Sequence, residues 1–129
     1  MIFVDTNYLI RFFLADVNSQ HKKAVELFED GAMEEVILFT STIVFFEVYW
    51  VMKTFYKKDK QELIAVLSNM LEMSFIKIKE SDVLQKTLNL YEKSNIELED
   101  CYNIEHAKNN KMSDFASFDK KLMKIINHI

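Results

Sequence analysis

The stretch that decides the fold is "IFVDTNYLIRFFLAD", residues 2–16. Its first three residues are apolar and suit a short buried strand, and the residues from Asn7 onward have the apolar spacing of a helix. Asp5 stands where the strand ends and the helix begins. Strands that alternate with helices form parallel sheets, and ligands bind such sheets beyond the carboxyl ends of the strands. Asp5 is therefore the first candidate site residue.

The rest of the chain continues the alternation of strands and helices. Further strands are expected at 36–40, 74–78 and, as a short candidate, 115–118. Helices are expected at 19–31, 42–56, 60–73, 81–94, 99–110 and 119–129, with Gly31 as the terminator of the first of these. With one glycine and no proline, the chain shows no linker or repeat. The sequence predicts an α/β fold, with a parallel sheet covered on both faces, in a single domain spanning residues 1–129.

Composition limits the classes of function. Half of the residues are hydrophobic, which disfavours disorder, and the net charge of -4 argues weakly against a nucleic-acid partner. Five lysines lie from Lys108 onward against two aspartates, so this basic end could contact phosphate or could equally be a solvated helix face. Cys101 is the single cysteine and cannot form an internal disulfide. No secretion signal or membrane span is evident, so we expect a cytoplasmic protein.

Three more carboxylates are expected near Asp5 at the edge of the sheet. Glu47 is the one charged residue in "IVFFEVYWVM", residues 43–52, while Asp100 opens a helix and Asp119 follows the last strand candidate. Clustered carboxylates repel each other unless a hard cation such as Mg²⁺ or Mn²⁺ neutralises them. Without metal, one of the four should hold a proton, and Glu47 is the candidate because its surroundings are the most apolar.

Three of these four acids could instead have a purely structural role at the start of a helix. Asp5 and Asp119 could cap the helices that follow them, and Asp100 could simply favour a helix N-terminus. Glu47 has the weakest structural alternative, since its neighbours are apolar. The four together favour metal-assisted hydrolysis of a phosphodiester.

Other chemistries fit the sequence less well. The three histidines show no zinc-hydrolase spacing, and no glycine-rich phosphate loop is present. Cys101 and His106 make a poor nucleophile pair, so Cys101 is expected to face the core. An aspartyl-phosphate fold is disfavoured because Asn7 stands where the phosphatase pattern D-x-D-x-T needs its second aspartate.

Four segments together resemble the PIN-domain family, in particular the small VapC-type ribonuclease toxins of toxin–antitoxin pairs. They are "FVDTNYLIRFFLAD", "STIVFFEVYWVMKTFY", "IELEDCYNIEHAK" and "FASFDKKL", and the resemblance covers essentially the whole chain. It implies a three-layer α/β/α sandwich with a four- to five-stranded parallel sheet. It also implies a Mg²⁺- or Mn²⁺-dependent endoribonuclease whose metal-binding and catalytic residues are Asp5, Glu47, Asp100 and Asp119.

The resemblance extends to supporting residues and to partners. Thr6, Asn7 and Ser117 match positions that support the acids and the metal's waters. Toxins of this kind pair as homodimers, cleave RNA, and are inhibited by a cognate antitoxin peptide that enters the acidic groove. A catalytically inactive PIN-like module that binds RNA or protein is the alternative.

Two residues of this chain depart from the family pattern, and a third residue is a further candidate for contact with a partner. Asn103 and Glu105 make the helix after Asp100 more polar than usual; Asn103 could approach the site, whereas Glu105 is expected to be exposed. Arg11 is the only arginine and lies one turn after Asn7. It could contact RNA phosphate or an antitoxin carboxylate, or it could form a salt bridge on the helix surface.

Overall fold

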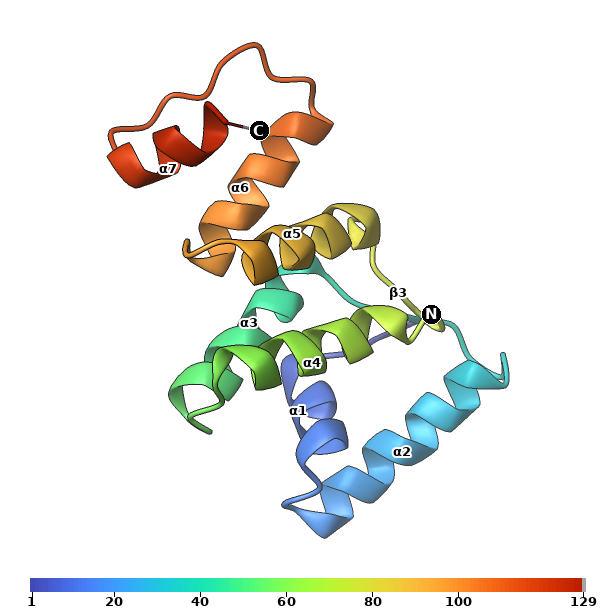
Figure 1. Ribbon diagram of the computed structural model, residues 1–129. Coiled ribbons are helices and arrows are strands. Elements are labelled where there is room, and N and C mark those ends of the chain that lie inside the picture. Colours follow the sequence, from blue (N-terminus) through green and yellow to red (C-terminus); the bar gives the residue numbers. More distant parts are fainter. Residues whose placement is uncertain (129) are drawn as a thin grey trace. The chain divides into compact units, whose positions relative to one another are not determined.

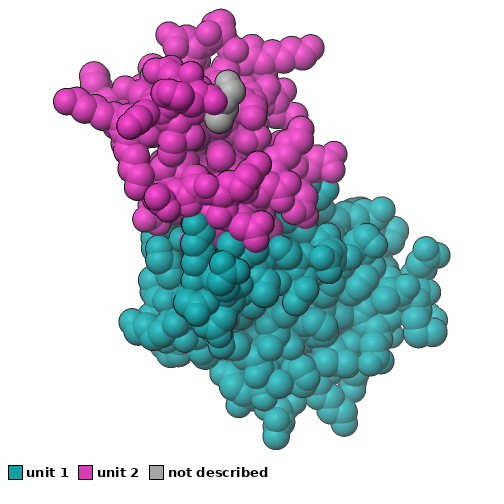
Figure 2. All heavy atoms as spheres, in the orientation of Figure 1, with its two compact units in different colours: residues 1–81 teal, residues 82–129 magenta. Residues whose placement is uncertain are grey.

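The computed structural model describes residues 1–128. The chain divides into two compact units, Met1–Ser81 and Asp82–Ile129 (Figure 2). The prediction of a single domain stays a prediction. No helix in the described part of the chain is long and apolar enough to cross a membrane.

The first unit contains a parallel sheet of three short strands. These are β1 (Ile2–Phe3), β2 (Leu38–Phe39) and β3 (Ile76–Lys77), in the order β1-β2-β3. Leu38 lies opposite Ile2 on one side and Ile76 on the other. The predicted parallel α/β sheet is therefore confirmed, since helices connect its strands.

The expectation of a sheet with four to five strands is wrong for the described residues, whose sheet has three strands. The candidate strand at 115–118 has no regular secondary structure, and the ring of Phe118 is fully exposed. A strand needs a partner for its backbone groups, and this segment pairs with none of the three strands of the sheet. β1 is itself an edge strand, which is why Ile2 and Phe3 are exposed although a buried strand was expected.

Four helices complete the first unit. They are α1 (Thr6–Leu14), α2 (Asn18–Ala32), α3 (Thr42–Thr54) and α4 (Lys60–Glu72). α1 packs against α2 and α3, and α3 packs against α4 (Figure 1). Phe45, Val48, Tyr49 and Met52 are wholly buried, so one face of α3 forms the centre of the core, as its apolar sequence predicted.

Gly31 lies inside α2 and does not terminate it. Its backbone does not adopt the left-handed conformation that a glycine helix terminator uses. A Cβ atom at this position would lie 2.6 Å from Cδ1 of Leu38 and 3.2 Å from Cδ2 of Phe75. Glycine is therefore required because α2 packs closely on β2, which local sequence patterns do not reveal.

The second unit is helical. It is built from α5 (Ser81–Lys93), α6 (Leu98–Asn109) and α7 (Lys120–Ile126). The predicted inward face of α5 is confirmed, since Val83, Leu84, Thr87, Leu88 and Tyr91 are buried. α7 ends earlier than the expected helix 119–129, and residue 129 lies outside the described residues.

Candidate active site

Asp5 occupies the turn between β1 and α1. It is the N-cap residue of α1 and has an extended backbone, with φ −82° and ψ 164°, but its side chain makes no capping hydrogen bond. An aspartate at this position ordinarily accepts a hydrogen bond from the second or third helical N–H. The carboxylate of Asp5 is exposed. Of the two roles that the sequence left open, side-chain capping is excluded, and the carboxylate is available for a ligand.

Thr6 joins the start of α1 to Glu47 on α3. The Thr6 hydroxyl donates a hydrogen bond of 3.0 Å to Oε1 of Glu47, across 41 residues of sequence. Thr6 is buried, with 8% of its surface exposed. The structure thus places the residue after Asp5 directly beside the glutamate, which agrees with the supporting role expected for Thr6. Asn7, the next residue, is exposed.

Glu47 itself is exposed, and the expectation of an apolar environment around it is wrong. The buried side chains of α3, including Val44 and Val48, lie on the face that packs into the core. Glu47 belongs to the other face, where Ile43 and Trp50 are also exposed. An apolar sequence on all sides of a helix does not require burial on all sides, because a packed helix covers only part of its surface.

Hydrogen bonds at the strand ends fix the elements that carry these side chains. The Thr40 hydroxyl donates a buried 2.7 Å hydrogen bond to the Val4 carbonyl and so ties the end of β1 to the end of β2. Ser41 then caps α3, since its Oγ accepts a 3.2 Å hydrogen bond from the Val44 N–H. The helices α1 and α3, which follow Asp5 and carry Glu47, therefore begin at defined points on the same edge of the sheet.

In the second unit, the pKa of Asp100 is raised by its surroundings. Burial raises the pKa of Asp100, and the negative charges of Asp119 and Glu97 raise it further. Asp119 caps α7, because its Oδ1 accepts a 3.0 Å hydrogen bond from the Leu122 N–H. Ser117 Oγ accepts a 3.0 Å hydrogen bond from the Asp119 N–H and so fixes the turn before that helix.

The four acids therefore fall into two pairs, Asp5 with Glu47 in the first unit and Asp100 with Asp119 in the second. Among residues 1–128, no group of three or more histidine, cysteine, aspartate or glutamate side chains is arranged to hold a metal ion. Mg²⁺ is usually bound through only one or two carboxylates, with waters and substrate phosphates completing its coordination. Within each pair the donor chemistry fits such a cation, because the side chains offer carboxylate oxygens, and a cation beside Asp100 would relieve the repulsion that acts on it.

Two neighbours of Asp100 on α6 are buried. Cys101 is buried as expected, and its sulfur lies 3.8 Å from the Ser94 hydroxyl. Glu105 was expected to be exposed, but only 7% of its surface is, and its carboxylate pairs with Lys108 at 3.5 Å. Glu105 lies on the same face of α6 as the buried Leu98, Cys101 and Ile104, and its position relative to Asp100 alone did not reveal this. Asn103 is exposed.

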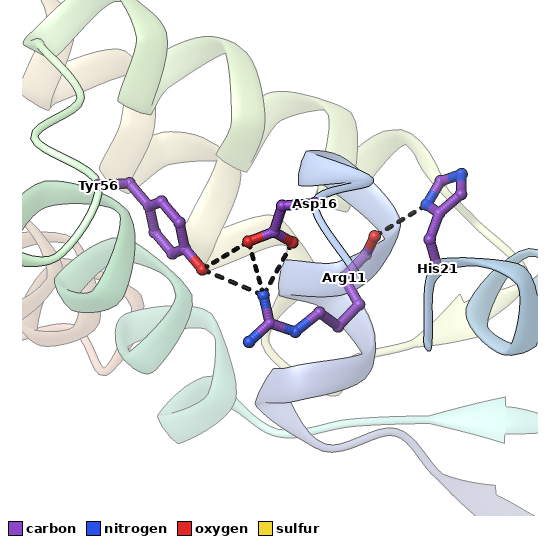
Figure 3. A network of polar contacts seen from close by, with 4 residues as sticks. All are labelled: Arg11, Asp16, His21 and Tyr56. Carbon is purple, nitrogen blue, oxygen red and sulfur yellow. Dashed lines mark hydrogen bonds and ion pairs between the residues drawn. The ribbon is translucent and has the colours of Figure 1, made fainter. Parts of the chain in front are cut away.

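Arg11 is part of a polar network that the sequence did not predict (Figure 3). Its Nη1 donates to both carboxylate oxygens of Asp16, at 2.8 and 2.9 Å, and to the Tyr56 hydroxyl at 3.1 Å. The Tyr56 hydroxyl in turn donates to Oδ2 of Asp16 at 3.1 Å. The hydrogen bond between Arg11 and Asp16 raises the pKa of the guanidinium and lowers the pKa of the carboxyl. The surface salt bridge that the sequence allowed is therefore present.

The backbone of Arg11, in the last turn of α1, also takes part in a hydrogen bond with a side chain of α2. His21 Nδ1 lies 2.8 Å from the Arg11 carbonyl oxygen (Figure 3), and because a carbonyl only accepts, Nδ1 carries the hydrogen. Arg11 Nε is buried and has no hydrogen-bond partner. A pocket of about 260 Å³ adjoins this side chain, and its lining also includes Asn7, Tyr8, Gln20 and Lys23. One lining residue, Asn7, lies two residues after Asp5 in the sequence, and the lining side chains offer several hydrogen-bond donors suited to an anion.

Comparisons with known proteins identify the family. A family model described as PIN domain matches residues 2–127. No curated protein and no solved structure matches the chain. The family match covers nearly the whole chain, and the α/β fold with its parallel sheet is consistent with it. The chain therefore belongs to the PIN domain family, whose members are generally nucleases.

Proposed function

We propose that this protein is a metal-dependent endoribonuclease and the toxin of a toxin–antitoxin pair. The observation that carries the proposal is the PIN domain match over residues 2–127. The uncapped carboxylate of Asp5 supports it, because a cap residue without its capping bond is free for another ligand. The resemblance of the sequence to the small ribonuclease toxins supports the narrower assignment.

In this proposal Asp5, Glu47, Asp100 and Asp119 hold Mg²⁺ or Mn²⁺. The bound cation would supply an activated water and would stabilise negative charge on the phosphate oxygens. The protein's own contribution is positional. Thr6 orients the Glu47 carboxylate through the 3.0 Å hydrogen bond, and Asn7 and Ser117 support the acids that adjoin them in sequence.

Arg11 would bind an RNA phosphate next to the acids. Its pairing with Asp16 and Tyr56 holds the guanidinium in one orientation, while Nε donates to no group in the described residues. Arg11 also lines the adjoining pocket together with Lys23, and an anion bound there would interact with both positive charges. If antitoxin affinity falls in Arg11→Lys and RNA affinity does not, the antitoxin is the partner of this residue.

We also propose that the protein forms a homodimer, as its resemblance to the small ribonuclease toxins implies. The molar mass measured by light scattering should therefore be that of a dimer. A monomeric wild-type protein would contradict the proposal.

Cleavage of purified RNA tests the proposed activity. The wild-type protein should cleave total RNA with Mg²⁺ or Mn²⁺ and should lose this activity in EDTA. Asp5→Asn should be inactive with metal, whereas Asp30→Asn makes the same chemical change at an exposed position of α2 and should remain active. Cleavage by Asp5→Asn in the presence of chelator would exclude this mechanism.

The alternative of an inactive binding module predicts a different result. Calorimetry would then detect Mn²⁺ binding, while no class of RNA would be cleaved. The toxin role is tested by asking whether a short neighbouring reading frame encodes a small protein that, on co-expression, forms a stable complex with this chain and restores growth.

A further inference from the structure

A groove of about 550 Å³ lies in the second unit, between α5 and the end of α6. Lys86, Asn89, Leu90 and Lys93 line it from α5, at positions i, i+3, i+4 and i+7, and therefore from one face of that helix. Glu105, Lys108, Asn109 and Lys111 line it from the end of α6. The groove thus collects four lysines and two amides around a single carboxylate.

Three of the four groove lysines form no ion pair with an acid in the described part of the chain. Glu105 forms an ion pair with Lys108 at 3.5 Å, and no ion pair of Lys86, Lys93 or Lys111 occurs within residues 1–128. The lining carries a net charge of +3, although the whole chain has a net charge of -4. Positive charge in a concave site concentrates its potential more than the same charge on a convex helix face.

The backbone after α6 brings two of these lysines together. Lys111 has a left-handed conformation, with φ 57°, and its N–H donates to the Lys108 carbonyl at 3.0 Å. The Asn110 side chain secures the same turn through a 2.8 Å hydrogen bond to the His106 carbonyl. This turn thereby fixes the backbone that carries Lys111, and both Lys108 and Lys111 line the groove.

We infer that this groove binds the phosphate backbone of single-stranded RNA. The inference deepens the proposed ribonuclease function and rests on it. Asp100 and Lys108 lie eight residues apart on α6, or about 12 Å along the helix axis. A strand whose phosphates occupy the lysine groove would therefore pass within a few nucleotides of Asp100. The groove selects a polyanion and not a base sequence, because its charged donors contact phosphates.

RNA binding measured without cleavage tests this inference. Fluorescence anisotropy of a labelled unstructured RNA would be recorded in EDTA over a range of salt concentrations, for the wild type and for Lys86→Gln/Lys93→Gln. The slope of log affinity against log salt is negative, and each lost phosphate contact to a single strand reduces its magnitude by about 0.7, so the magnitude should fall by about 1.4 in the double variant. Adding Lys108→Gln and Lys111→Gln should bring the loss to about 2.8.

Lys22→Gln/Lys57→Gln is the matched control, since both residues are exposed and lie outside the groove. Its slope should equal that of the wild type. Equal slopes for the groove variants and this control would overturn the inference. Glutamine preserves helix propensity, and circular dichroism would verify that the variants fold. Because binding is measured without metal, failure of the groove inference is distinguishable from failure of the nuclease proposal, which is judged by cleavage alone.

Discussion

The hydrogen bond between Thr6 and Glu47 permits a quantitative test of the site. Thr6→Val removes the hydroxyl and retains the branched shape of the side chain. A hydrogen bond to a charged acceptor contributes about 1.5–3 kcal/mol. Glu47 is exposed, so water can replace the lost donor, and we expect a loss of about 1 kcal/mol in the free energy of unfolding. For 129 residues this corresponds to about 3–4 °C in Tm.

A double-mutant cycle isolates this interaction from other effects of the substitution. Unfolding by urea in EDTA at neutral pH would be measured for Thr6→Val, for Glu47→Ala and for the double variant. The cost of Thr6→Val should nearly vanish in the Glu47→Ala background, which gives a coupling energy of about 1 kcal/mol. Thr54→Val should show no coupling to Glu47, because the Thr54 hydroxyl bonds the Trp50 carbonyl within α3.

A coupling energy indistinguishable from that of the Thr54 control would refute the assignment of Thr6 as the residue that orients Glu47. If the bond positions the carboxylate for cleavage, Thr6→Val should also lower kcat and leave KM unchanged. A rise in KM alone would instead indicate that Thr6 contributes to substrate binding.

Three further predictions follow from packing and charge. Gly31→Ala should lower the free energy of unfolding in urea by about 1 kcal/mol, because the clash with Leu38 outweighs the gain in helix propensity. A variant more stable than the wild type would contradict the close packing of α2 against Leu38. The pKa of Asp16 is lowered in the folded state by its contact with Arg11. The ion pair therefore stabilises the folded protein at pH values above the ordinary pKa of aspartate, and this stabilisation is lost as the pH falls and Asp16 takes up a proton. Thermal melts should accordingly show a weaker acid dependence for Asp16→Asn than for the wild type, and identical profiles would contradict the pairing. The pKa of Asp100 is raised, so the stability of the metal-free protein should decline as the pH rises through the pKa of this residue. Asp100→Asn should therefore have a higher Tm than the wild type in EDTA at neutral pH. Added Mg²⁺ should raise the Tm of this variant less than that of the wild type.

Local sequence patterns predicted most of the secondary structure. α3, α4 and α5 lie within two residues of the segments expected from their apolar spacing, because helix periodicity depends on neighbours three and four residues apart. The strands were located at the right places but were too long, since a strand extends only as far as its neighbour pairs with it. The candidate strand at 115–118 was wrong for the same reason.

For the candidate site, the sequence determined the residue types and the positions of the acids along the chain. "VDTN" at the end of a strand and a lone glutamate in an apolar helix were sufficient to select Asp5 and Glu47. Their spatial relation depends on contacts between distant segments. Only the tertiary structure pairs Thr6 with Glu47 and leaves Asp5 uncapped, because both outcomes depend on how α1 and α3 begin at the edge of the sheet.

The tertiary structure alone also decided three properties that no local pattern encodes. Arg11 finds its partners five and 45 residues away, so its role was left open by the sequence. Gly31 is required by the approach of α2 to β2, and not by its own backbone conformation. The spacing of Lys86 and Lys93 could have indicated a shared helix face, but the groove exists because α6 supplies its other wall. In each case the deciding interaction joins residues of different elements of the fold, whereas periodicity reports only on neighbours within one element.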